Sequence, residues 1–457
     1  MEKEHRCVLV WFRRDLRLTD NPALTAALAS AATVVPVYVH DADADGAWAP
    51  GAASRAWLHH SLKALDGELQ GRGARLVIRR GATREVLPAL VSEAGATAVF
   101  WNRLYEPARI AGDRDIAQTL RRSGIATASF NAALWAEPST LGTASGTPYR
   151  VFTPFWRALS AVLPGPTVES APEQIPTRAL PSDALDSLGL QPRIGWDLGF
   201  WRHWQPGETG AITRLQTFLD TGLRGYRERR DRPADAGISR LSPHLHFGEI
   251  GPRQILAVIR GAQAGDQVPE ADAEHFLREL GWREFAHHLL FHYPQTPTQP
   301  LDPAFAQFPW RKSRDYADDL RAWQRGETGV PLVDAGMREL WATGWMHNRV
   351  RMVAASFLTK NLLIPWQEGA RWFWDALVDA DLANNTLGWQ WVAGCGADAA
   401  PYFRIFNPLL QARKFDPGGD YVRRWAPDAG RGVVDPVADL AATRQRALDA
   451  YAQTRRR

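Results

Sequence analysis

Between residues 379 and 391 the chain gathers acidic, amide and indole side chains at helical spacing. If this segment is helical, Asp381, Asn385 and Trp389 fall at positions i, i+4 and i+8 and share one face. Carboxylates in such an apolar, tryptophan-rich segment need donors such as Arg351 or the hydroxyls of a ligand. The segment therefore favours a ligand site. A metal site is disfavoured because no ligand histidine lies nearby, whereas an aspartate-capped structural helix stays an alternative.

A second group of polar residues lies in the segment that contains Trp345, Asn348 and Met352. In one continuous helix these residues fall at i, i+3 and i+7, so an indole, an amide and a thioether share a face. An amide on an otherwise apolar face needs a hydrogen-bonding partner. The partner is either another core group or a ligand, and the pattern leaves both open.

Two earlier segments could bind phosphate or form ion pairs. Residues 239–242 read Ser-Arg-Leu-Ser and precede Pro243, where a helix is predicted to start. Backbone N–H groups at a helix start bind phosphate readily, although a serine before proline is also an ordinary helix beginning. Glu279 and Arg283 fall at i and i+4, which alone predicts no more than a surface ion pair.

Metal and disulfide sites are not predicted. His287, His288 and His292 have no acidic or cysteine partner at matching spacing, so we expect them on the surface of a helix. Cys7 and Cys395 are the only cysteines and lie far apart in the sequence. They exclude a disulfide framework and a cysteine-based iron–sulfur or zinc site.

The elements that must position these residues fall into two predicted domains. Residues 1–135 alternate apolar strands with amphipathic helices, which is typical of a Rossmann-like parallel α/β sheet. Residues 136–206 are rich in proline, glycine and serine and predict an interdomain linker. Residues 207–457 carry helical periodicity without strand patterns, which predicts an all-α domain. The predicted strands lie near residues 8–10, 34–39, 76–78 and 98–100, and the predicted helices include 54–69, 84–94, 273–290, 336–358 and 371–382.

The composition of the chain limits the classes of partner that it is expected to bind. Hydrophobic residues make up 45% and charged residues 23%, which is ordinary for a globular protein. No apolar run approaches the about 20 residues that span a bilayer, and the chain start lacks the apolar core of a secretory signal, so we expect a cytoplasmic protein without a membrane partner. Nearly all positive charge is arginine, which suits phosphate binding, and twenty tryptophans suggest stacking, interfaces or electron transfer.

Six ordered blocks resemble the photolyase/cryptochrome family over nearly the whole chain. The resemblance implies an α/β antenna-binding domain and an all-α FAD-binding domain. The implied function is light-driven repair of cyclobutane pyrimidine dimers in UV-damaged DNA, by electron transfer from reduced FAD to the flipped dimer. The pattern is most similar to the bacterial class III dimer photolyases, which are sisters of the plant cryptochromes. The blocks are residues 11–21, 149–155, 239–245, 282–285, 344–352 and 379–391.

The resemblance assigns roles to the matching positions, and it implies no metal. It implies cofactor binding by Tyr226, Ser239, Arg240, Leu241, Ser242, Phe276, Glu279, Arg283, Trp345, Asn348, Arg351, Asp379, Asp381 and Asn385. It implies catalytic contacts by Glu279, Trp282, Asn348, Met352, Asn385 and Trp391. Electron transfer to the flavin falls to Trp310, Trp366 and Trp389, and DNA binding to Arg230, Arg349, Arg404, Trp282 and Trp391.

We state two further expectations, one for Glu279 and one for Ile238. Glu279 can donate a hydrogen bond to the dimer only when protonated, so burial is expected to raise its pKa. Ile238 stands where the family has threonine, which removes one hydroxyl from the phosphate site. We expect FAD binding to survive this loss.

Positions that differ between family members distinguish the repair enzymes from the cryptochromes. Six-four photolyases place paired histidines in the lesion pocket, where this chain has Asn348. Plant cryptochromes place aspartate at the positions of Asn348 and Asn385 and tyrosine at the position of Trp391. The chain also ends at Arg457 without a long tail for signalling. A monomeric repair enzyme is therefore predicted, and a cryptochrome-type blue-light photoreceptor without repair activity is the alternative.

The resemblance also implies a light-harvesting antenna. Class III enzymes suggest methenyltetrahydrofolate. Familiar folate-binding members have an Asn-Glu pair where this chain has Ala108 and Arg109, so a deazaflavin, or no antenna, is the alternative.

Overall fold

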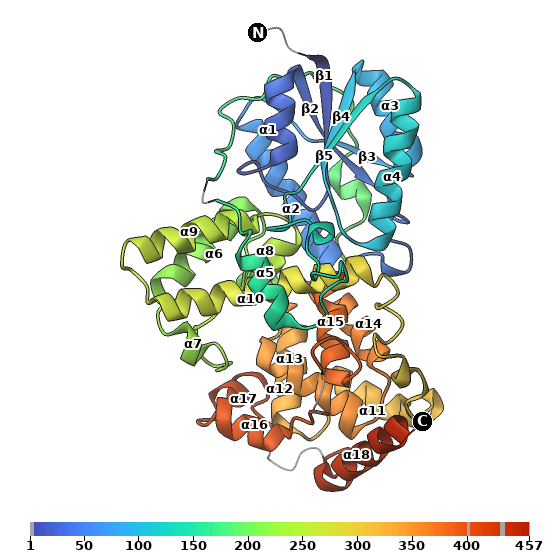
Figure 1. The fold of residues 1–457 in the computed structure, drawn as a ribbon, viewed down its shortest axis with the longest axis vertical. Helices are drawn as coiled ribbons and strands as arrows, with labels where there is room; N and C mark the ends of the chain where they lie inside the picture. The colour runs from blue at the N-terminus through green and yellow to red at the C-terminus, as the bar shows by residue number, and fades with distance from the viewer. Residues whose placement is uncertain (1–3, 166, 400–402, 430–434, 457) are drawn as a thin grey trace.

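In the computed structural model, a parallel sheet lies at one end of the molecule and a large assembly of helices at the other (Figure 1). The structure describes residues 4–165, 167–399, 403–429 and 435–456. The predicted fold class, an α/β domain followed by a helical domain, is confirmed.

The sheet has five parallel strands in the order β3-β2-β1-β4-β5. The central strand β1 is buried on both faces, and its Val8 pairs with Val34 on one side and Ala98 on the other. Parallel strands covered by helices are expected to be nearly continuous apolar runs, as here. The fifth strand was not predicted, since its sequence Ala-Thr-Ala-Ser-Phe has few large apolar residues and its burial is only partial. The strands are β1 (His5–Phe12), β2 (Ala31–His40), β3 (Val77–Arg80), β4 (Ala98–Asn102) and β5 (Ala126–Phe130).

Four helices cover this sheet, and their ends follow local sequence signals. The first begins at Pro22, directly after Asn21, whose side chain accepts a hydrogen bond from the Leu24 N–H at 3.2 Å. The third ends at Gly95, which has a φ of 57° and so takes the left-handed conformation that commonly ends a helix. The four helices are α1 (Pro22–Ser30), α2 (Ala52–Gln70), α3 (Thr83–Ala94) and α4 (Pro107–Arg122).

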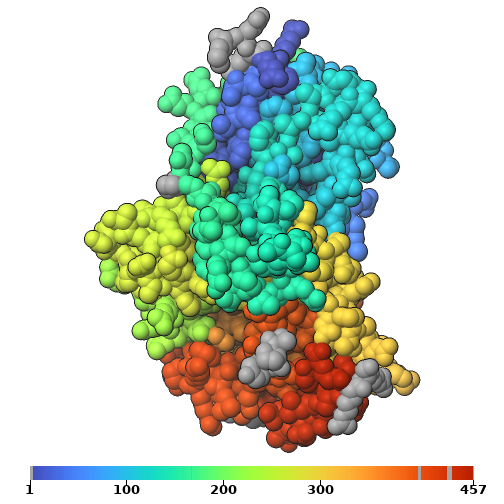
Figure 2. All heavy atoms as spheres, in the orientation of Figure 1, coloured from blue at the N-terminus to red at the C-terminus, as the bar shows by residue number. Residues whose placement is uncertain are grey.

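The region between the domains is attached to both. Its later part runs along the α/β domain, where Val34 donates a hydrogen bond to the Pro176 carbonyl at 2.7 Å and Ile175 donates to the Arg72 carbonyl at 3.0 Å. Its earlier part forms α5 (Phe152–Ser160), which packs against the helical domain and lies across the front of the junction in Figure 2. The boundaries at residues 135 and 206 stay a prediction.

The helical domain is built around two apolar clusters. The larger contains the fully buried Trp323, Trp366 and Phe357. Within the described part of the chain, no helix is long and apolar enough to cross a membrane. The helices are α6 (Glu208–Thr221), α7 (Tyr226–Arg229), α8 (Ser242–His246), α9 (Pro252–Ala264), α10 (Glu270–His292), α11 (Ser313–Arg325), α12 (Pro331–Thr343), α13 (Asn348–Ser356), α14 (Trp366–Ala376), α15 (Leu382–Ala393), α16 (Pro408–Phe415), α17 (Asp420–Trp425) and α18 (Leu440–Arg456).

The prediction of one helix through Trp345, Asn348 and Met352 is wrong. Helix α12 ends before Gly344, whose φ of 69° breaks it, and α13 begins only at Asn348. A Cβ at Gly344 would lie 2.6 Å from the Phe200 ring, so both backbone and packing require glycine here. Trp345 therefore lies in the turn between the two helices instead of on the face of α13.

Candidate functional site

A cavity of about 190 Å³ lies among α13, α14 and α15. It brings together the two groups of polar residues that the sequence singled out, although they come from separate segments. A Cβ built on Gly388 would meet no atom within 4 Å, so this part of the lining faces open space. The cavity is lined by Asn348, Arg351, Met352, Ala355, Phe373, Leu377, Asp379, Ala380, Asp381, Asn384, Asn385, Gly388, Trp389 and Val392.

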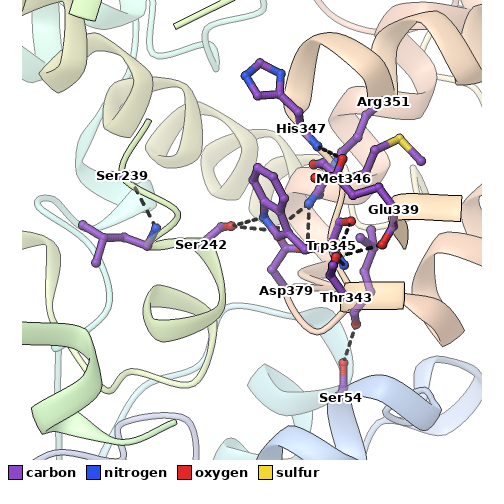
Figure 3. Close-up of polar contacts among 12 residues, drawn as sticks. Ser54, Ser239, Ser242, Glu339, Thr343, Trp345, Met346, His347, Arg351 and Asp379 are labelled. Atoms are coloured by element: carbon purple, nitrogen blue, oxygen red, sulfur yellow. Dashed lines mark hydrogen bonds and ion pairs between the residues drawn. The ribbon is translucent and has the colours of Figure 1, made fainter. Parts of the chain in front are cut away.

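Arg351 and Asp379 form the ion pair of this site (Figure 3). The Arg351 Nη2 atom lies 2.9 and 3.1 Å from the two carboxylate oxygens of Asp379, whose side chain is only 3% exposed. Ser242 donates to Asp379 at 2.6 Å, and the Trp345 indole donates to the Ser242 hydroxyl at 3.1 Å. The Arg351 Nε–H is used by the Met346 carbonyl at 2.7 Å. The predicted partnership of Arg351 with a carboxylate is confirmed, and the network connects α8 to the turn before α13.

Asp381 is both a helix cap and a buried carboxylate. Its Oδ1 atom accepts from the Asn384 N–H at 2.9 Å and from the Asn384 side-chain amide at 2.7 Å. Its Oδ2 atom lies 3.5 Å from His246 Nδ1 and 3.6 Å from His287 Nε2. Burial opposes ionisation of Asp381, but His287 and His246 in their protonated forms, together with Arg283, lower the pKa of the carboxyl well below its usual range.

The histidines of α10 are not where the sequence placed them. His287 and His288 are 5% and 1% exposed, so the expectation of a helix surface is wrong for both. No local signal marked this burial, because Glu279, Arg283 and His287 share a face at i, i+4 and i+8, and such a charged face is typical of a helix surface. His246, from α8, was not considered in the sequence and is the second residue that reasoning from motifs missed.

The predicted stripe of Asp381, Asn385 and Trp389 is confirmed on α15. The Asn385 side-chain amide donates to the Ala370 carbonyl at 3.0 Å, which fixes its orientation. The Trp389 ring is buried against Phe373, at 5.0 Å between ring centroids. A Cβ on Gly369 would lie 2.0 Å from the Trp389 ring, so the indole is held in a slot that only glycine leaves open.

The segment that was predicted to bind phosphate, residues 239–242, reaches this network through Ser242. Tyr226 is buried at the start of α7 and its ring meets that of Phe276 at 5.4 Å. Arg240 has a φ of 51°, a conformation that a non-glycine residue rarely takes, and its guanidinium lies 4.9 Å from the Trp345 ring. The Leu241 N–H donates to the Ser239 hydroxyl at 3.4 Å.

Glu279 does not pair with Arg283, so that prediction is wrong. Its carboxylate instead binds the Arg230 guanidinium, which also contacts His275 at 3.0 Å. Arg283 donates to the Ala133 carbonyl at 2.7 Å and lies 3.7 Å from Glu284. The Glu279 side chain is 29% exposed and lies next to this cation.

The predicted lesion tryptophans and the remaining arginines each have a protein partner. Trp282 stacks on Phe152 of α5 with ring centroids 3.8 Å apart and planes 9° apart. The Arg404 guanidinium lies 4.9 Å from the Trp391 ring. Arg349 forms a 2.8 Å ion pair with Asp231. These groups are partly exposed, in contrast to the buried Asp379.

The predicted electron-transfer tryptophans lie in or against one core cluster, and Trp310 is more exposed than Trp366 and Trp389. Trp389 and Trp366 are each 2% exposed, whereas Trp310 is only partly buried and packs on Phe308 at 4.4 Å between ring centroids. Burial separates Trp310 from the other two but does not order Trp389 and Trp366, so the electron-transfer path stays a prediction. The ring contacts of Trp389 itself are with Phe373 and Trp323.

Comparison with known protein families gives two matches that cover both domains. A model described as DNA photolyase matches residues 8–177, and a model described as the FAD binding domain of DNA photolyase matches residues 276–432. The second match contains the ion pair of Arg351 and Asp379 and the whole of α15.

Individual relatives match nearly the full chain. A deoxyribodipyrimidine photo-lyase of Agrobacterium fabrum is 45% identical over 482 residues, covering 98% of each chain. Cryptochrome-1 of Arabidopsis thaliana is 39% identical over 439 residues, which are 94% of this chain and 64% of the cryptochrome. The crystal structure of a bacterial class III photolyase from Agrobacterium tumefaciens superposes with a TM-score of 0.94 at 44% identity, covering 100% of this chain and 99% of the other.

Proposed function

We infer that the chain belongs to the photolyase/cryptochrome family and is a deoxyribodipyrimidine photo-lyase that repairs cyclobutane pyrimidine dimers in DNA. The observation that carries this conclusion is the near-complete match to a photolyase sequence and to a class III photolyase structure. The residue roles below are our proposals, and they rest on the geometry of the cavity.

The residues present fit a flat, amphipathic ring such as the isoalloxazine of FAD. The cavity joins apolar walls, including Phe373 and Val392, to a fixed set of donors and acceptors from Arg351, Asp379 and Asp381. A planar ring with polar edges needs this combination. The open space at Gly388 supports the fit, because a side chain there would narrow the cavity.

We assign the FAD contacts in two groups. Ring contacts fall to the residues that line or border the cavity, and phosphate and ribityl contacts fall to the wall around α7, α8 and α10. The ring group is Trp345, Asn348, Arg351, Asp379, Asp381 and Asn385. The second group is Tyr226, Ser239, Arg240, Leu241, Ser242, Phe276, Glu279 and Arg283.

Reduced FAD, when bound, supplies the photoexcited electron that opens the cyclobutane ring of the dimer. The protein must then hold the lesion against this site and exclude water. Asn348 and Met352 line the cavity, and Glu279 can bond to a pyrimidine once Arg230 is drawn to a phosphate. Trp282 and Trp391 offer aromatic faces to the extruded bases, and such stacking offsets the cost of base flipping.

DNA binding falls to Arg230, Arg349 and Arg404 in this proposal. Their ion pairs or ring contacts lie at partly exposed positions, where a phosphate can compete with them. Phosphate contacts of this kind make affinity fall as salt rises. Trp389, Trp366 and Trp310 form the proposed path that carries electrons inward to the flavin.

A folate antenna, methenyltetrahydrofolate, is proposed for the cavity of about 310 Å³ between the two domains. Its lining includes the edge-to-face pair of Trp48 and Trp374 and the guanidinium of Arg109, which is held by Asp45 at 2.6 Å. It reaches Leu382, the first residue of α15, and so lies close to the flavin cavity. A second cavity of about 830 Å³, bordered by the same Arg109, is the alternative position. Mass spectrometry of chromophores extracted from the purified protein distinguishes folate, deazaflavin and no antenna.

The decisive experiment measures repair directly. Reduced protein is mixed with dimer-containing DNA and illuminated with near-UV or blue light, and recovery of thymine absorbance is followed. Recovery that requires light supports the proposal. Absence of recovery from a chain that holds FAD would favour the alternative, a cryptochrome-type photoreceptor, for which the 39% identity to a plant cryptochrome is the supporting observation. A cytoplasmic location and a monomeric state stay predictions.

A further inference from the structure

Two imidazoles approach the same oxygen of Asp381 from behind the flavin cavity. His246 Nδ1 lies 3.5 Å and His287 Nε2 lies 3.6 Å from Asp381 Oδ2, and both imidazole side chains are only 6% exposed. These distances exceed those of a hydrogen bond. His246 Nδ1 is buried and has no hydrogen-bond partner within the described residues. The carboxylate oxygen of Asp381 therefore lies near two ring nitrogens without a hydrogen bond of ordinary length to either.

The hydrogen bond at the other ring nitrogen of His287 fixes its tautomer. His287 Nδ1 lies 2.9 Å from the Arg283 carbonyl oxygen, and since a carbonyl can only accept, Nδ1 must carry the proton. In the neutral ring, Nε2 then presents a lone pair toward the Asp381 carboxylate. Two acceptors that face each other cannot bond, which accounts for the long separation. Protonation of Nε2 would turn this contact into a charge-assisted hydrogen bond.

Charged and titratable groups face His287 from each of the elements packed against it. Arg283 lies on its own helix, Asp381 caps α15, and His246 approaches from α8. From the α/β domain, Glu106 adds negative charge and is paired with Arg14. Burial lowers the pKa of the His287 imidazole, while Asp381 and Glu106 act in the opposite direction. The ring is therefore poised to gain a proton when negative charge increases nearby.

We propose that His287 is a positioning residue for Asp381, which takes up one proton when the neighbouring flavin gains negative charge and then donates from Nε2 to Asp381 Oδ2. This inference rests on the proposed contact between Asp381 and FAD. The proton comes from solvent through the interdomain cavity that His246 lines, and no covalent bond to carbon changes. The new hydrogen bond withdraws charge from Asp381, which lowers its repulsion of the reduced, anionic flavin.

The sign of the pH dependence follows. Burial lowers the His287 pKa, so with oxidised FAD we expect a neutral ring at pH 7 that binds a proton only at lower pH. Reduction of FAD by two electrons and one proton adds one net negative charge, which raises the His287 pKa. Between the two pKa values reduction takes up one additional proton, so the midpoint potential falls more steeply as pH rises. One proton in a two-electron couple adds about 30 mV per pH unit.

Spectroelectrochemistry of the full FAD-bound chain between pH 5 and 9 tests the proposal, with the electrode supplying the electrons. His287→Gln should remove the additional slope and leave the remaining pH dependence of flavin reduction. His288→Gln is the matched control, because His288 is equally buried on the same helix but accepts from the Tyr149 N–H. The control should keep the wild-type slope. An unchanged slope in His287→Gln would overturn the proposal.

A second measurement reads the imidazole itself. In the wild-type chain with ¹⁵N-labelled histidine, we expect one ring with protonated Nδ1 throughout, whose Nε2 titrates at higher pH after flavin reduction. His287→Gln should delete this signal and His288→Gln should retain it. If no histidine changes its titration between the two redox states, the proposal is wrong even should His287→Gln fold poorly. A purified chain without flavin absorbance would overturn the proposed function as well, and so is a distinct result.

Discussion

The proposed flavin side of the helical domain, around Arg351 and Asp379, and its proposed DNA side, around Arg349 and Asp231, use similar residues in opposite ways. On the flavin side, Asp379 is 3% exposed and is bonded to Arg351 and Ser242. On the DNA side, Asp231 is 33% exposed and is paired with Arg349. The two arginines are similarly exposed, 23% for Arg351 and 17% for Arg349, so the pairs differ in their carboxylates. Buried pairs are costly to break, whereas exposed pairs contribute little and exchange easily. A resident cofactor and a transient substrate need these two kinds of pair.

The largest effect is expected for Asp379→Asn on the flavin side. The variant leaves the Arg351 cation without its carboxylate in a largely buried network, which costs about 3–5 kcal/mol in comparable pairs. We expect loss of bound FAD and a lower melting temperature. Flavin absorbance per chain and calorimetry measure the two effects. Retention of a full complement of FAD would contradict the assignment of Asp379 to the flavin side.

Glu284 of α10 extends the comparison to pH. Glu284 is buried where its carboxylate accepts from the Trp135 N–H at 3.0 Å, and burial raises its pKa to about 7. The protonated form is favoured in the folded chain, so this contribution to stability is complete below pH 4.5 and is lost as pH rises through about 7. Glu284→Gln should remove up to about 3 kcal/mol of this pH dependence. Melting temperatures of the wild type and of Glu284→Gln across pH 4.5–7.5 test this, and an equal pH dependence in both chains would contradict it.

On the DNA side, Arg404→Gln should weaken binding to dimer-containing DNA about tenfold without loss of flavin. The loss of one phosphate contact should also reduce the slope of log affinity against log salt by about 1. Titration of DNA at several salt concentrations measures both values. Arg75→Gln, whose side chain is 79% exposed on the α/β domain, is the matched control and should leave the slope unchanged.

The smallest effect sharpens the contrast with Asp379. Asp231→Asn should raise DNA affinity a few-fold, because it frees Arg349 for a phosphate and removes a negative charge near it. Its cost in folding stability should stay below about 1 kcal/mol, as for exposed pairs generally. DNA titration combined with thermal denaturation checks both. A drop in affinity would mean that Asp231 orients Arg349 for binding instead of competing for it.

Sequence patterns predicted the frame of the molecule because periodicity is local. The four apolar strands of the α/β domain were recognised from their own residues, and β5 escaped because it is a partly exposed edge strand with small side chains. The break at Gly344 was missed because apolar periodicity continues through it. Gly344 was itself a local signal, since a left-handed glycine commonly ends a helix, and only its close packing against Phe200 depends on the fold.

The candidate site was only partly predictable for a similar reason. Asp381, Asn385 and Trp389 share one helix, so spacing alone placed them on a common face. The partners of Glu279 and Asp381 are Arg230, His246 and His287, which come from other helices and become neighbours only after folding. Family resemblance supplied residue roles but not these contacts.

The region between the domains contacts both of them, and this limits where the chain can be cut into fragments. Helix α5 lies before residue 207, yet Phe152 covers Trp282 and Phe155 packs on Phe285. A fragment that starts at residue 207 would leave these aromatic faces of α10 in water. We therefore expect the helical part to need α5 for its stability, and a chimera that exchanges the α/β domain should keep α5 with the helices that it covers.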